Sequence, residues 1–183
     1  MIFSETPFAL NDGRPALLRS PGPDDAAEML DFITKASGET EFLLKYPEEF
    51  ADYTLEREEG FLRSTEQSPD QTMIACYVDG RIAGNCQIAF HPGMKERHRA
   101  SVAIALLREY WGLGIGTEMF RAMIRLAEER EGVRQIELDF IEGNDRARHL
   151  YEKLGFRITG VKPDAIRFRD GRFANEYMMV KKL

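Results

Sequence analysis

One segment of this chain limits the folds open to it more than any other. Residues 100–107 (ASVAIALL) form a largely apolar run that leads into a glycine-rich stretch, residues 111–116 (WGLGIG). We expect a buried strand followed by a tight turn. Residues 117–130 then predict an amphipathic helix, because apolar side chains recur at helical spacing: Met119, Phe120, Met123, Ile124 and Ala127.

Further strands and helices are predicted on both sides of this unit. Residues 133–141 (VRQIELDFI) indicate the next strand, so strand, helix and strand should form a parallel, right-handed crossover. Asp79-Gly80 lies between two apolar runs and predicts a β-hairpin of residues 72–78 and 81–90. The other predicted elements are strands at 14–19 and 156–161, a helix starting at Pro23, helices at 54–64 (with Thr54 as a cap) and 145–154, and a closing hairpin of 165–169 and 172–180.

The order of these elements indicates the fold class. Two helices, three antiparallel strands and the crossover predict an α+β (mixed α/β) protein with a central mixed, mostly antiparallel sheet flanked by helices. The 183 residues are enough to bury one core. We expect an N-terminal arm or edge strand at residues 1–13 and a single domain at residues 14–183.

Composition and cysteine content favour a cytoplasmic protein. No apolar run approaches the ~20 residues that span a bilayer, and residues 1–10 lack the basic residues of a signal peptide. In a two-residue hairpin, Cys76 would face Ala83 and Cys86 would face Met73, which places the two sulfurs roughly 10 Å apart along the sheet. That separation exceeds the reach of a disulfide, and free thiols fit the cytoplasm.

Charge limits the class of partner. The net charge is −6, whereas nucleic-acid binding needs clustered Lys and Arg to neutralise phosphates. We therefore expect no nucleic acid and no membrane as partner, and an acidic surface is compatible with a cationic amine. The His and Cys residues show no metal-ligand spacing, so we expect no metal.

The glycine-rich stretch is a candidate phosphate site. Glycines allow close backbone approach, and a helix N-terminus offers unpaired N–H groups and a positive dipole end. Two familiar loops do not fit. Gly116 is followed by Thr117 without the lysine of the Walker loop, and the spacing is G-x-G-x-G rather than the G-x-G-x-x-G of dinucleotide folds. Alone, the stretch also fits a tight start to a helix.

A second motif lies one strand downstream, where residues 144–156 read NDRARHLYEKLGF. Together the two motifs closely resemble the GNAT superfamily of N-acetyltransferases. In that family a Q/R-x-x-G-x-G/A turn precedes an N-x-x-A-x-x-L-Y-x-x-x-G-F helix, and both motifs stand here in the family's order and spacing. The resemblance covers roughly residues 14–183. One position departs from it, because Trp111 stands where the family has Gln or Arg.

The resemblance implies an acetyl-CoA site. The glycine stretch would hold the pyrophosphate, and Trp111 would pack beside the cofactor or anchor the core. Asn144 would hold the pantetheine arm or cap its helix. Tyr151 would protonate the leaving sulfur as general acid, and the Leu106 backbone N–H would stabilise the oxyanion. The residues implied at the cofactor are Leu106, Leu107, Trp111, Gly112, Leu113, Gly114, Ile115, Gly116, Thr117, Asn144, Ala147 and Tyr151.

The resemblance further predicts an acetyl-CoA-dependent N-acetyltransferase acting on a primary amine of a small molecule or peptide. Residues 39–44 and Tyr46 are candidates for lining the acceptor pocket, and a homodimer through strand edges or the C-terminal hairpin is compatible with the sequence. The general base is not identified among its candidates, which are Glu109, Glu137, Asp139, His91 and His98. Three alternatives stay open: a non-catalytic acyl-CoA-binding or regulatory module, a ribosomal-protein-type N-terminal acetyltransferase, and an unrelated nucleotide binder.

Overall fold

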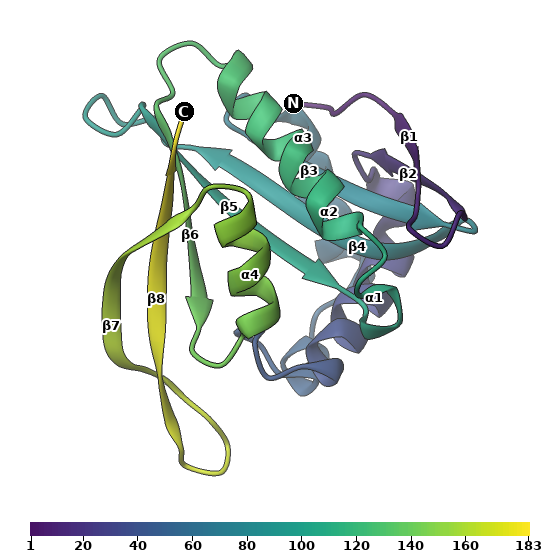
Figure 1. The fold of residues 1–183 in the computed structure, drawn as a ribbon. Helices are drawn as coiled ribbons and strands as arrows, with labels where there is room; N and C mark the ends of the chain where they lie inside the picture. Colours follow the sequence, from purple (N-terminus) through teal and green to yellow (C-terminus); the bar gives the residue numbers. More distant parts are fainter. The chain divides into compact units, whose positions relative to one another are not determined.

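The computed structural model describes residues 1–183, which form two compact units (Figure 1). The first unit contains Met1–Ala89 and Ala103–Met119, and the second contains Phe90–Val102 and Phe120–Leu183. Strand β5 (Arg99–Leu106) and helix α3 (Ile115–Glu129) each contribute residues to both units.

The first unit is built on four consecutive antiparallel strands. Their order is β1-β2-β3-β4, with Leu17 facing Pro7 on one side and Tyr77 on the other. The segment predicted as an arm or edge strand thus contains a paired strand, β1. The bounds are β1 Thr6–Ala9, β2 Pro15–Arg19, β3 Gln71–Val78 and β4 Arg81–Phe90, and the last residue of β4 belongs to the second unit.

Two helices cover the first unit's core. Helix α1 (Ala26–Glu39) follows a 3₁₀ turn at Pro23–Asp25, and α2 (Leu55–Gln67) follows a second one at Pro47–Phe50. The cap predicted for α2 is confirmed, because the Thr54 side chain accepts the backbone N–H of Arg57 at 3.3 Å. The shared core is apolar: Ala26, Met29, Phe32, Ala36, Leu62, Met73, Ala75, Tyr77, Ile82, Ala105 and Leu107.

The β3–β4 hairpin forms as predicted, with Asp79 at φ 51° and Gly80 at φ 76°, but its predicted register is wrong. Cys76 faces Gly84 and Cys86 faces Ile74, because the ladder shifts by one residue between Cys76 and Tyr77. One extra residue on a strand moves every pair beyond it. Both cysteines are free, as predicted, and both are buried.

The second unit confirms the predicted parallel crossover. The start of β5 pairs in parallel with β6 (Gln135–Ile141) through Arg99↔Gln135, Ala100↔Ile136 and Ser101↔Glu137, and the chain between them contains α3. All other described strand pairs are antiparallel, so the predicted mixed, mostly antiparallel pairing is confirmed. Helix α4 (Asp145–Lys153) follows β6.

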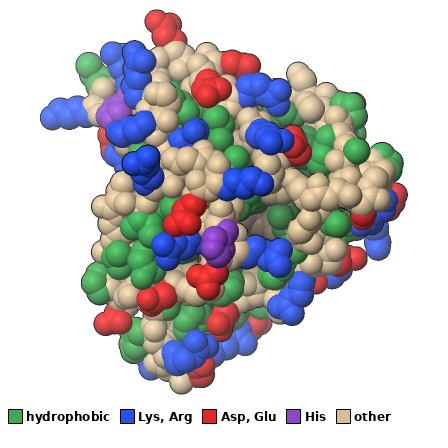
Figure 2. Space-filling model, in the orientation of Figure 1, with side chains coloured by type: hydrophobic (Ala, Val, Ile, Leu, Met, Phe, Trp, Pro, Cys, Tyr) green, Lys and Arg blue, Asp and Glu red, His purple; other side chains and the backbone are tan.

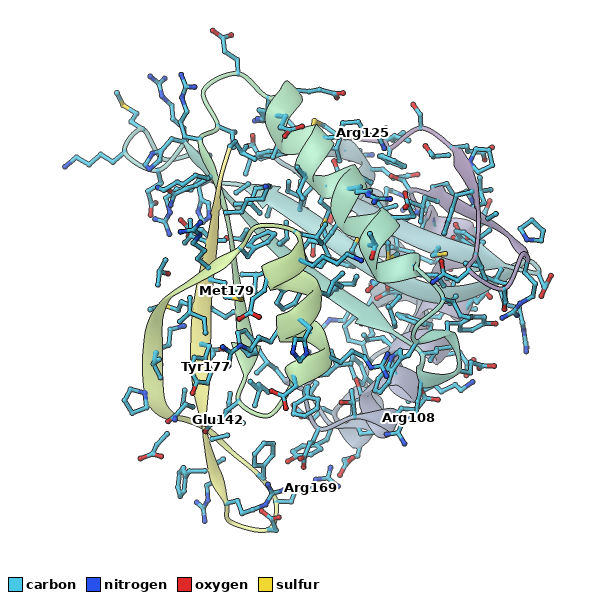
Figure 3. All side chains as sticks on the ribbon, in the orientation of Figure 1. Arg108, Arg125, Glu142, Arg169, Tyr177 and Met179 are labelled. Carbon is cyan, nitrogen blue, oxygen red and sulfur yellow. The ribbon has the colours of Figure 1, made fainter.

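The C-terminal strands are longer than predicted. The sequence indicated a strand at 156–161 and a separate hairpin arm at 165–169, whereas the structure has one strand, β7 (Arg157–Arg167), paired with β8 (Phe173–Lys182). The register shifts between Lys162 and Ile166, where Asp164 has φ 51°. A bulge therefore absorbs the break that Pro163-Asp164 suggested. In Figure 3, Met179 marks β8, and it is fully buried.

The surface carries both signs of charge. On the face drawn in Figure 2, basic and acidic side chains are interspersed. No helix combines the length and the apolar character that crossing a membrane requires.

Candidate active site

The glycine stretch predicted to bind phosphate forms a tight loop between β5 and α3. Gly112 has φ 81° and Gly114 has φ 94°, a region that side-chain-bearing residues rarely occupy, whereas Leu113 between them has no positive φ. Residues that alternate in this way turn successive backbone N–H groups toward one side and form an anion-binding concavity. This alternation suits the phosphate site that the sequence predicts.

The start of α3 adds further donors. The helix begins at Ile115, two residues earlier than predicted, so Gly116 and Thr117 lie in its first turn. The first intrahelical bond is donated by Glu118 N–H to Gly114 O at 3.2 Å. The backbone N–H groups of Ile115, Gly116 and Thr117 precede that bond and have no intrahelical acceptor. They are available to an anion at the positive end of the helix dipole.

Asn11, in the turn after β1, contacts this loop. Its backbone N–H donates to Leu113 O at 3.0 Å, and its side-chain Nδ2 donates to Gly112 O at 3.0 Å. The Asn11 Oδ1 atom lies 3.1 Å from where a Cβ on Gly114 would stand. Sequence analysis missed Asn11, because about one hundred residues separate it from the loop and no local pattern marks the contact.

Trp111 has a structural contact at the start of the loop. Its indole Nε1–H donates to Leu106 O at 3.1 Å, and the Arg108 guanidinium carbon lies 5.6 Å from the centre of its ring. Leu107 is also engaged, since its N–H donates to Ala83 O at 3.0 Å and its carbonyl accepts Tyr110 N–H at 3.0 Å. The end of β5 is thus fixed before the chain reaches the glycines.

The short 3₁₀ turn Arg108–Tyr110, between β5 and the loop, is bound to the end of α1. Arg108, labelled in Figure 3, donates its backbone N–H to the Glu39 carboxylate at 2.6 Å, and its guanidinium donates to the Glu39 carbonyl. Glu109 forms an ion pair with Lys35 at 2.8 Å. Glu39 is a candidate for the acceptor pocket and Glu109 is a candidate base. In the structure each carboxylate has a partner, Arg108 N–H for Glu39 and Lys35 for Glu109.

The second predicted motif forms the N-terminus of α4. Asn144 caps the helix, because its side-chain oxygen accepts Ala147 N–H at 3.3 Å. One of the two roles predicted for Asn144 is thus visible. The cap uses Oδ1, and a contact with the pantetheine arm, which is the other predicted role, would use the Nδ2 donor.

Tyr151 is buried among aromatic rings. Its exposed fraction is 7%, and its ring centre lies 5.2 Å from that of Phe120, 6.1 Å from that of Phe140 and 6.2 Å from that of Phe156. Burial raises the pKa of the Tyr151 phenol to about 12, because the anion would lose its hydration. The phenol is therefore protonated at neutral pH, which is the state a proton donor needs.

Of the remaining predicted bases, Glu137, Asp139 and His91 have side-chain partners within the second unit, whereas His98 contributes its backbone carbonyl to bonds with the N–H groups of Arg134 and Gln135. Glu137 binds Arg99 through both carboxylate oxygens, at 2.6 and 2.7 Å, and this pairing lowers the pKa of Glu137. Asp139 accepts Lys162 at 2.9 Å, and His91 Nε2 lies 2.9 Å from Ser101 Oγ. A carboxylate whose pKa is lowered is a weaker base, so Glu137 is not favoured for removing a proton.

The end of β6, just before Asn144, is held by β8. Glu142 accepts the backbone N–H of Asn175 at 3.1 Å and the Tyr177 hydroxyl at 3.3 Å, and Glu142 and Tyr177 lie next to each other in Figure 3. The Tyr177 ring stacks on Phe140 at 5.3 Å and 18°. These contacts position the chain segment that leads into α4, and sequence analysis did not identify them.

Known proteins share this sequence pattern and fold. The family model for the acetyltransferase (GNAT) family matches residues 37–156. L-amino acid N-acetyltransferase AaaT of Escherichia coli (strain K12) is 28% identical over 110 residues, which are 60% of this chain and 66% of AaaT. The chain thus spans slightly less than two thirds of that relative.

Solved structures of acetyltransferases also resemble this chain. An acetyltransferase of the GNAT family from Streptococcus pneumoniae has a TM-score of 0.85 at 30% identity, covering 92% of this chain and 99% of that one. The structure of yncA from Salmonella typhimurium with its cofactor acetyl-CoA has a TM-score of 0.76 at 15% identity, covering 99% and 95%, and this likeness is one of fold. Because the family model matches more than half of its length, this chain belongs to the acetyltransferase (GNAT) family.

Proposed function

We propose that the protein is an acetyl-CoA-dependent N-acetyltransferase that acetylates a primary amine of a small molecule or peptide. One observation carries the cofactor part of this proposal. The loop has positive φ at Gly112 and Gly114 directly before a helix N-terminus, in a member of the GNAT family. That backbone suits a pyrophosphate, which takes several N–H donors at once.

The residues present fit the pyrophosphate of acetyl-CoA. The donors we assign to it are the backbone N–H groups of residues 113–117, and Thr117 also offers its hydroxyl. Gly112 and Gly114 allow the positive φ values that turn these N–H groups toward one side of the loop. We assign Trp111 a supporting role rather than a direct contact, since its indole N–H is bound to Leu106 O.

For the acyl transfer, acetyl-CoA supplies an activated thioester. The amine nitrogen forms a bond to the acyl carbon, and the carbon–sulfur bond breaks. The Leu106 backbone N–H is the group we assign to the negative charge that develops on the carbonyl oxygen. Leu107, with its N–H in the sheet and its carbonyl bound to Tyr110, keeps a packing role beside the cofactor.

Tyr151 is the residue that we assign as general acid. It donates its phenolic proton to the departing sulfur, and the proton lost by the amine restores it through solvent. With the pKa of Tyr151 at about 12 and that of a free thiol near 8.5, transfer to a hydrated thiolate is uphill by about 5 kcal/mol. Exclusion of water from the sulfur raises the thiol pKa and narrows this gap.

Asn144 and Ala147 complete the assigned site on α4. The Asn144 Nδ2 donor is assigned to the pantetheine arm, while Oδ1 keeps its cap bond to Ala147. Ala147, whose N–H donates to Asn144 Oδ1, is assigned a place beside the arm. Free, buried Cys76 and Cys86 support a reducing compartment, so we retain the cytoplasm as the proposed location.

Calorimetric titration with acetyl-CoA, with ATP as control, tests the cofactor part directly. We expect one site at micromolar affinity and no heat from ATP. An amine screen that follows thiol release then tests turnover. A folded protein that does not bind acetyl-CoA contradicts the proposal, whereas tight binding without turnover on any amine favours a non-catalytic acyl-CoA module.

A further inference from the structure

The turn between β1 and β2 binds backbone carbonyl groups of the glycine loop. Asn11 donates two hydrogen bonds to consecutive carbonyls, from its backbone N–H to Leu113 O and from Nδ2 to Gly112 O, both at 3.0 Å. The next carbonyl, of Gly114, accepts Glu118 N–H. All three carbonyls therefore have a fixed direction.

Fixed carbonyls determine where the loop's donors point. In a planar trans peptide the C=O of one residue and the N–H of the next point in opposite directions. The carbonyl of Gly112 shares its peptide with the N–H of Leu113, and the carbonyl of Leu113 shares its peptide with the N–H of Gly114. When Asn11 binds these two carbonyls, it turns both N–H groups away from itself.

We propose that Asn11 is a positioning residue for the acyl-CoA pyrophosphate, acting through the direction of the Leu113 and Gly114 N–H groups. This inference rests on the proposed function. It also gives the N-terminal segment a part in cofactor binding, although the segment lies before residues 37–156, which the family model matches.

The turn has other bonds that hold its shape without the Asn11 side chain. Leu10 N–H donates to Arg14 O at 2.8 Å, and Gly13 N–H donates to Leu10 O at 2.9 Å. Asp12 accepts the backbone N–H of Arg14 at 3.1 Å and pairs with its guanidinium at 2.8 Å. Replacing Asn11 by alanine should thus leave the hairpin folded and remove only the bond to Gly112.

The test compares four proteins: wild type, Asn11→Ala, Asn11→Asp and the control Asp12→Ala, which alters the same turn without touching the loop. We expect the Kd for acetyl-CoA to rise about three- to tenfold in Asn11→Ala, which is the effect of one hydrogen bond. It should rise further in Asn11→Asp, because a carboxylate would face the Gly112 carbonyl. Asp12→Ala should stay within about twofold of wild type.

Two further readouts separate positioning from general stability. Hydrogen exchange in the free protein should quicken at the Leu113 amide in Asn11→Ala, because its peptide loses the bond to Gly112 O, and not at the amides of β3. With an accepted amine, the KM for acetyl-CoA should rise while kcat stays unchanged.

The inference is overturned if Asn11→Ala binds acetyl-CoA as wild type does, or if Asp12→Ala loses as much affinity. Failure of the proposed function looks different, because the wild type itself would then not bind acetyl-CoA. In that case the exchange measurement still decides whether Asn11 orders the loop.

Discussion

Replacing Gly114 by alanine separates the phosphate cradle from an ordinary tight turn. Gly114 has φ 94°, and a Cβ there would stand 3.1 Å from Asn11 Oδ1 and 3.6 Å from its Nδ2. The substitution therefore strains the backbone and also presses on the side chain that binds Gly112 O. Asn11 can retreat only by lengthening or breaking that bond.

The expected cost follows from these two effects. A residue with a side chain in the left-handed region costs about 1–2 kcal/mol, and one hydrogen bond is worth about 0.5–1.5 kcal/mol. Together they give a loss of about 1.5–3.5 kcal/mol in the free energy of unfolding. For a chain of this size that corresponds to a fall in Tm of roughly 3–14 °C. Because the donors on both sides of Gly114 would move, the Kd for acetyl-CoA should rise about tenfold or more.

The assay is a thermal unfolding curve and an acetyl-CoA titration on each protein, with Gly132→Ala as the matched control. Gly132 has φ 85°, and a Cβ there would meet nothing within 4 Å. The control carries the same backbone strain without the collision and lies outside the loop. It should lose about 1–2 kcal/mol of stability and keep the wild-type Kd.

Two results would refute the reasoning. If Gly114→Ala binds acetyl-CoA with the wild-type Kd, the loop's donors do not hold the cofactor. If Gly132→Ala loses affinity in proportion to its loss of stability, the binding defect reports a weaker fold and not a displaced cradle.

Substitutions at three other positions test the assigned chemistry and one ion pair. Tyr151→Phe should lower kcat by about 100-fold with little change in KM, measured by thiol release, because the ring packing on Phe120 remains. Burial raises the pKa of Tyr151 to about 12 from an ordinary value near 10, so the protonated phenol contributes fully to stability below pH 10, and this contribution is lost as pH rises to about 12. The wild type should therefore lose about 2–3 kcal/mol of unfolding free energy over this range that Tyr151→Phe does not lose, which unfolding curves at alkaline pH would show. Asn144→Asp should keep the helix cap and the Tm while weakening acetyl-CoA binding. Asn144→Ala should lose the cap, at a cost of about 1 kcal/mol in stability, and should also bind acetyl-CoA more weakly. Equal Kd values for Asn144→Asp and the wild type would show that Asn144 is a helix cap only. Glu137→Gln should cost about 1 kcal/mol at pH 7; because Arg99 lowers the pKa of Glu137, the wild-type advantage should vanish as pH falls below the ordinary carboxyl range, which urea unfolding at pH 7 and pH 3 would show.

The parts of the fold that sequence analysis predicted correctly have local causes. The β3–β4 turn needs a left-handed pair, and Asp79-Gly80 supplies it at φ 51° and 76°. The Thr54 cap and the start of α4 at Asn144 depend on side chains within three residues of the backbone they bind. Patterns of this range can be read from the sequence directly.

The wrong or missing predictions concern features that depend on contacts between two separate elements. The register shift between Cys76 and Tyr77 is a property of the β3–β4 pairing, and it cannot be predicted from the residues of β3 alone. Pro163 normally marks the end of a strand, yet β7 continues past it, since the extra residues before Ile166 bulge out of the pairing with β8. Asn11 belongs to the same group, because its two bonds join segments about one hundred residues apart.

The departure at Trp111 and the contact at Asn11 are connected. Where the family has Gln or Arg, which offer side-chain donors to the pyrophosphate, this chain has an indole whose N–H is committed to Leu106 O. Under the proposed function, binding of the pyrophosphate would therefore rest on backbone donors of the loop, and a backbone donor contributes only when its peptide already points toward the ligand. Trp111 fixes the chain before the glycines, and Asn11 fixes the carbonyls of Gly112 and Leu113 within the loop. If the proposed function holds, bracing of the loop by Trp111 and Asn11 would take the place of a direct contact from its first residue to the pyrophosphate.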